Sequence, residues 1–156
     1  MATDSATAAH AIKSAFVAAA STLLPEGTLV TFGHPGPQVK NYQDAVSFAR
    51  VEVGQQVAAF GGTRPREETV TLTVVVSCYR PGGPEVEEEA SAAAYGLLRD
   101  LEHYVRQTDT TLGGTCRHCF LVSHFSEGET RPDLIVNGRT IEIEAMFEAK
   151  VRVTGP

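Results

Sequence analysis

Basic side chains are scarce in this sequence, whose 156 residues carry 13 Lys and Arg against 19 Asp and Glu, a formal net charge of −6. Proteins that bind phosphate backbones rely on clustered Lys and Arg, so the excess of acidic side chains argues against a nucleic-acid-binding role. It also disfavours a basic helix lying on a membrane surface. No run approaches the ~20 apolar residues of a membrane-spanning helix, and the first residues lack the basic region of a secretory signal. We therefore expect a cytoplasmically made protein with no membrane partner.

Cysteine is also scarce, and the three cysteines form an odd number that indicates free thiols in a reducing compartment. Cys116 and Cys119 make one Cys-x-x-Cys pair, which is half of a tetrahedral zinc site. The second pair at the usual spacing is missing, although other side chains could complete the set: His124, His118, His103 or Cys78. Buried free thiols are the favoured interpretation, because unpaired cysteine behaves as a small hydrophobic residue. A zinc site stays open as the alternative, and we expect no cofactor.

Motifs of catalysis are missing as well. The sequence contains no Gly-x-Ser-x-Gly nucleophile turn, no His-Glu-x-x-His pair and no phosphate-binding loop ending in Lys-Ser or Lys-Thr. The chain is long enough to bury a sizeable core within one domain. We therefore expect a single domain over residues 1–156 that is not an enzyme.

What the sequence does contain is clear periodicity. Two segments place apolar residues at helical spacing, and five alternate apolar and polar residues or form short β-type runs. The predicted order is α-β-β-β-α-β-β, over residues 4–24, 28–32, 47–53, 69–78, 85–107, 115–125 and 141–153. Asp4 or Ser5 is expected to cap the first helix. Consecutive strands without crossover helices predict an α+β fold, with a mixed or mostly antiparallel sheet and both helices packed on one face.

Fifteen residues, 54–68, separate two of the predicted strands, and we interpret them as a long arm. Long loops in a small domain are usually functional or mobile. The arm contains two apolar residues that would be exposed for no reason unless they contact something. It also contains two arginines and two glutamates that follow a Gly-Gly hinge. The candidate contact residues are Val57, Phe60, Arg64, Arg66, Glu67 and Glu68.

The order of these features resembles one known family. A helix and a short strand precede a strand that ends in the Gly-rich arm, and Arg-x-Arg-Glu-Glu at 64–68 leads directly into Val-Thr-Leu-Thr-Val-Val-Val at 70–76. A helix with an acidic start and the core Leu-Leu-Arg-Asp-Leu-Glu at 97–102 follows, and a strong final strand ends the pattern. Over nearly all of its length the chain resembles the tail terminator proteins of long-tailed bacteriophages, also called minor tail or tail completion proteins.

The resemblance implies a six-subunit ring at the head-proximal end of the tail tube, which stops tube polymerisation and presents a surface to the neck. It implies a virion protein made in the host cytoplasm. Its partners would be further copies of itself, the major tail tube protein and a neck or head-completion protein, and DNA would pass through the lumen without specific binding. The sheet and the arm would build the ring and touch the tube. An acidic protein suits such a lumen, and a long terminal strand suits subunit association because it needs a paired or covered edge.

Two competing classes remain open. One is a zinc-dependent enzyme or zinc-stabilised binding module that uses Cys116, Cys119 and His124. The other is a nucleic-acid-binding protein, for which the only candidate basic patch is Arg64, Arg66 and Arg80.

Overall fold

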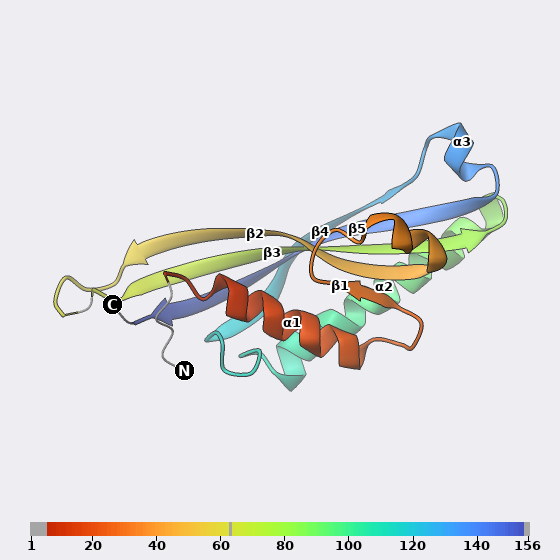
Figure 1. Ribbon diagram of the computed structural model, residues 1–156. Helices are drawn as coiled ribbons and strands as arrows, with labels where there is room; N and C mark the ends of the chain where they lie inside the picture. Colours follow the sequence, from red (N-terminus) through yellow and green to blue (C-terminus); the bar gives the residue numbers. More distant parts are fainter. Residues whose placement is uncertain (1–5, 63, 155–156) are drawn as a thin grey trace.

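Five strands form one mixed sheet in the computed structural model, which describes residues 6–62 and 64–154 (Figure 1). The strands lie in the order β1-β2-β3-β5-β4; β1 runs parallel to β2, and the other neighbours are antiparallel. Their bounds are β1 Leu29–Thr31, β2 Asp44–Val57, β3 Arg66–Pro81, β4 His118–Gly128 and β5 Gly138–Val153. The helical segments are α1 Ala9–Leu23, η1 Gly36–Asn41, η2 Pro84–Val86, α2 Glu87–His103, η3 Tyr104–Thr108 and α3 Pro132–Ile135.

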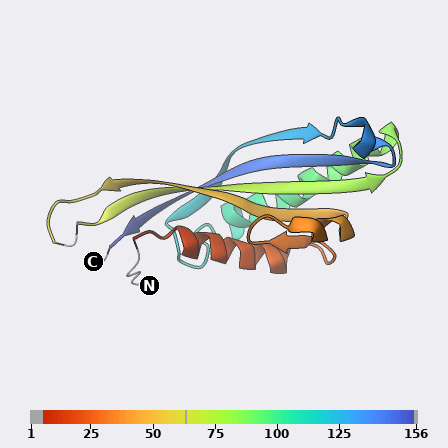
Figure 2. The same ribbon diagram turned by 45° about the horizontal axis from the view of Figure 1, so that its top comes forward.

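The two long helices, α1 and α2, lie side by side against the same face of the sheet (Figures 1 and 2). Phe16 of α1 lies in the core, with its ring centroid 5.1 Å from that of Phe48 and 5.0 Å from that of Phe147, both edge to face. These three rings join the helix to strands β2 and β5, which is the geometry that aromatic pairs prefer. The predicted α+β class, the element order and the one-sided helix layer are thus confirmed.

Alternation explains why β3 and β5 hold the centre of the sheet. Every second residue of β3 from Glu68 to Cys78 is buried, and so is every second residue of β5 from Ile141 to Ala149. Side chains of a strand point alternately to opposite faces, so one face of each strand is apolar and covered by helices. The other face carries threonines on β3 and glutamates on β5.

The strands are longer than predicted, and the prediction of a fifteen-residue arm is wrong. Pairing between β2 and β3 continues outward to Val57 opposite Arg66, which leaves only residues 58–65 as the connecting loop. The predicted loop is therefore mostly a β-hairpin. The hairpin extends beyond the helix layer at one end of the molecule, and the β4–α3–β5 connection lies at the opposite end (Figures 1 and 2).

Smaller differences occur at the helices. The first helix begins at Ala9, later than predicted, and the expected capping residues Asp4 and Ser5 lie outside the described residues. The second helix ends in a π-helical turn, η3, and α3 was not predicted. Within the part of the chain that the structure describes, no helix is both long and apolar enough to cross a membrane.

Candidate interaction surfaces

The described residues at the tip of the β2–β3 hairpin form a turn with exposed apolar side chains. The backbone N–H of Ala58 donates to the carbonyl of Pro65 at 2.7 Å, and that of Arg64 donates to Gly61 at 3.2 Å. Phe60 is 86% exposed and Val57 is 53% exposed. Two exposed apolar side chains on one turn make the tip a candidate interaction surface.

The two arginines of the hairpin differ in their surroundings. Arg64 is exposed at the tip, in the left-handed region at φ 52°. Arg66 is half-buried in β3, and its Nε atom is buried without a hydrogen-bond partner. Within residues 6–62 and 64–154, neither arginine takes part in an ion pair. Arg64 is therefore the cation that the hairpin offers to a partner, whereas Arg66 belongs partly to the fold.

Glu67 and Glu68, by contrast, face groups of their own chain. Glu67 pairs with Arg117 at 2.9 Å and lies 4.0 Å from the Nε atom of Arg152. Glu68 is only 1% exposed. The prediction that Glu68 lies on a solvated docking loop is therefore wrong, because β3 begins two residues before it and turns its side chain toward the helices.

Glu68 ties the hairpin to the start of α1. Its Oε1 accepts a hydrogen bond from the backbone N–H of Ala8 at 2.8 Å, and its Oε2 accepts one from Gln55 Nε2. The same Gln55 amide donates to the carbonyl of Ala6 at 2.9 Å. A carboxylate at this position satisfies a free N–H of the helix N-terminus and interacts favourably with the helix dipole. The base of the hairpin is thus fixed to the helix layer.

The candidate zinc ligands do not come together as a set of three among the described residues. Cys116 and Cys119 are buried free thiols, and burial raises the pKa of Cys116 to about 11 and that of Cys119 to about 12. His124 is exposed on β4, where its ring contacts Tyr95 of α2 edge to face at 5.7 Å between centroids. Across the described residues, no group of three or more His, Cys, Asp and Glu side chains could hold a metal ion. The interpretation of these two cysteines as buried free thiols is confirmed.

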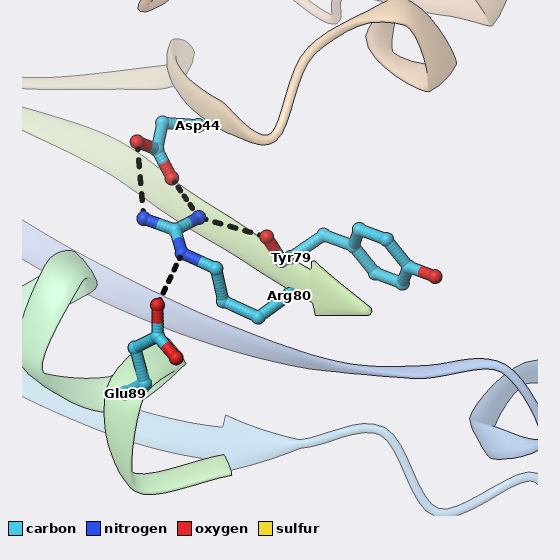
Figure 3. Close-up of polar contacts among 4 residues, drawn as sticks. All are labelled: Asp44, Tyr79, Arg80 and Glu89. Carbon is cyan, nitrogen blue, oxygen red and sulfur yellow. Dashed lines mark hydrogen bonds and ion pairs between the residues drawn. The ribbon is translucent and has the colours of Figure 1, made fainter. Parts of the chain in front are cut away.

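Arg80 does not join Arg64 and Arg66 in a basic patch. It lies at the other end of β3, about 45 Å from Arg66 by strand length, and its guanidinium is occupied (Figure 3). Arg80 Nη1 donates to Asp44 at 2.7 Å and to the carbonyl of Tyr79 at 2.8 Å, and its Nε lies 3.6 Å from Glu89. The hydrogen bond to Asp44 is the largest cause of a raised pKa for Arg80. The three arginines that were the only candidate basic patch for nucleic acid therefore do not form one.

A second surface, which the sequence did not predict, lies at the end opposite the hairpin. Phe125 and four glutamates line a hollow of about 260 Å³ between β4 and β5; the glutamates are Glu127, Glu129, Glu142 and Glu144. Partial desolvation in the hollow, followed by the charges of the three other glutamates, raises the pKa of Glu142. The alternating glutamates of the last strand were visible in the sequence. The position of β4 at the sheet edge beside them was not.

Neighbouring exposed apolar residues extend this surface along β4. Among the described residues, this strand is the outermost of the sheet on that side and pairs only with β5. Phe125 is 54% exposed, and Phe120 and Val122 are also exposed on the strand. A long edge strand with exposed apolar residues is a template for pairing with another chain unless something covers it.

Compared with protein-family models and with curated proteins, the chain matches none.

Proposed function

We propose that this chain is a structural virion protein that caps the head-proximal end of a phage tail tube as a six-subunit ring. The ring ends polymerisation of the tube and forms the surface that joins the neck. In this role the chain is made in the host cytoplasm, has no catalytic activity, and contacts further copies of itself, the major tail tube protein and a neck or head-completion protein. DNA passes through the lumen without specific binding.

The observation that carries the proposal is the projecting hairpin. It combines an aromatic side chain that is 86% exposed, Phe60, with an exposed arginine that makes no ion pair among the described residues, Arg64. Exposed aromatic residues and arginines are the residue types that dominate binding energy at protein interfaces. The hairpin stands clear of the helix layer (Figure 1), so it can reach a neighbouring subunit or the tube without any rearrangement of the core.

Two further features support an assembly role. The edge strand β4 exposes apolar residues along its length, as described above, and subunit association would cover them. The net charge of −6 favours a lumen along which DNA slides without sticking. The zinc alternative has no comparable support, because Cys116 and Cys119 are buried and His124 faces Tyr95 instead.

The test is a capping assay with the tube protein encoded in the same genome. We expect the purified chain to form particles of six times its own mass, and to shorten tubes when added during their polymerisation, as measured in electron micrographs. Phe60→Ser should weaken capping while leaving circular dichroism and thermal stability unchanged. Leu23→Ser, which changes an exposed apolar residue on the helix layer, is the matched control. Tubes of the same length with and without the chain would contradict the proposal.

A further inference from the structure

We infer that the hairpin tip of one copy docks on the acidic end of β4 of a second copy, so that chains join head to tail. This inference deepens the proposed function and rests on it for closure of the array into a ring. The two surfaces are the tip, residues 57–62 and 64 with Val57, Phe60 and Arg64, and the acidic edge, formed by Phe120, Val122, Phe125, Glu127, Glu142 and Glu144.

The acidic edge offers three things that a partner could use. Its backbone is free on one side: within the described residues, 120–128 make no backbone–backbone hydrogen bond outside the ladder with β5. Its aromatic side chains are exposed, including Phe125 directly opposite Glu144. Its carboxylates lack cations, because Glu127, Glu142 and Glu144 form no ion pair among the described residues.

Like charges within the acidic edge favour the arrival of a cation. Glu127 and Glu142 stand directly opposite each other in the β4–β5 ladder, where like charges are destabilising. Desolvation raises the pKa of Glu142, and the neighbouring carboxylates raise it further. Arg131, on the connection between β4 and β5, is engaged with Glu129 at 3.4 Å. A guanidinium from outside the chain would relieve this repulsion.

The tip supplies what the acidic edge lacks. Arg64 provides a cation that no described residue neutralises, and Phe60 and Val57 provide apolar surface beside it. Each surface therefore places apolar side chains beside charged ones, and the charges of the two surfaces have opposite signs. Such complementarity sets register and speeds encounter between partners.

The two surfaces cannot meet within one chain. The tip and the glutamates of the acidic edge lie toward opposite ends of the long sheet (Figure 1), whose central strands of 16 residues span about 50 Å. Phe120 and Val122 extend the acidic edge back along β4. Contact between the two surfaces therefore requires a second copy, and it uses a different surface on each partner. A contact of this heterologous kind generates a closed ring when its rotation closes and a filament when it does not.

Charge reversal on each surface tests the inference. Variant A is Arg64→Glu, and variant B is Glu127→Lys with Glu142→Lys; all three side chains are exposed. Each variant alone places like charges across every contact, so we expect its apparent dissociation constant to rise at least about tenfold in analytical ultracentrifugation. Mixing A with B should restore assembly, because the reversed tip of A meets the reversed edge of B, and the two unreversed surfaces meet in turn.

Matched controls separate the contact from net charge. Arg99→Glu, on the exposed face of α2, changes charge as variant A does, and Glu26→Lys with Glu52→Lys changes it as variant B does. Both controls should assemble like wild type, and circular dichroism should show that every variant is folded.

The inference is overturned if A or B assembles like wild type, if their mixture does not, or if the wild-type chain stays monomeric at millimolar concentration. Tube capping is scored separately with wild-type chain. If the wild-type chain caps tubes but variants A and B assemble normally, only this contact is withdrawn. If assembly depends on these charges but the wild-type chain does not cap tubes, only the proposed function is withdrawn.

Discussion

Replacing Glu68 should destabilise the whole fold, although the residue lies in the segment that the sequence suggested was an exposed arm. Glu68→Ala removes the acceptor for the N–H of Ala8 and for the side chain of Gln55. Leaving a buried donor without a partner costs about 1–3 kcal/mol, and Glu68 is 1% exposed, so water cannot readily replace it. Some relaxation is expected at the chain terminus. We therefore expect a loss of about 2–4 kcal/mol in the free energy of unfolding.

That loss is a large part of the 5–15 kcal/mol that is typical of a domain, given as an order of magnitude. For a chain of this length it corresponds to a fall of roughly 5–15 °C in Tm. Urea denaturation followed by far-ultraviolet circular dichroism measures it. Glu67→Ala is the matched control, because its partner Arg117 is largely exposed and such pairs contribute about 0–1 kcal/mol. If Glu68→Ala were no less stable than Glu67→Ala, the carboxylate would not anchor the helix to the hairpin.

Three other predictions concern the core, the thiols and the hairpin. Phe16→Ala should cost about 3–5 kcal/mol because it empties the centre of the aromatic cluster, whereas Phe60→Ala should leave stability in urea unchanged; equal losses would contradict this. The three buried thiols should resist Ellman's reagent at pH 8 until the chain is unfolded, because burial raises their pKa from 9.0 to about 11 or 12. A raised folded-state pKa stabilises the protonated fold, so that contribution is constant below pH 9 and should be lost as pH rises from 9 towards 12. In hydrogen-exchange measurements, amides of 66–68 should be protected and those of 59–62 should exchange quickly, and fast exchange throughout would indicate an unpaired arm.

The sequence predicted the element order because its periodicities are strong where the core is. The alternation of residues 70–78 and 141–153 reports burial on one face, and that burial is what the structure shows. The hairpin was missed because its strand ends lack such a periodicity. Residues 54–56, Gly-Gln-Gln, have no apolar alternation, yet they continue a ladder whose partner strand is long and regular. Pairing with that strand decides their conformation, and a local pattern does not reveal it.

The interaction surfaces, too, could be predicted only in part from the sequence. Phe60 and Arg64 stood out in the sequence because they lie in a polar, Gly-rich stretch, and both are exposed at the tip. The acidic edge could not be assembled from the sequence, since Phe125 and Glu142 become neighbours only through the β4–β5 pairing. Glu68 was misplaced because nothing in a run of charged residues distinguishes a solvated carboxylate from one that accepts hydrogen bonds at a helix terminus.

The correction to the arm changes the energetics expected of assembly. A flexible fifteen-residue loop would have to be ordered on binding, and each immobilised residue would subtract from the free energy of association. Here the ladder to Val57 and Arg66, together with the Glu68 anchor, fixes the hairpin in the single subunit. Only the short loop between Val57 and Arg66 remains to be ordered, and two backbone hydrogen bonds already join its described residues. In the proposed assembly the tip would therefore meet a second copy at a small entropic cost, so that one aromatic residue and one arginine can suffice as the centre of the contact.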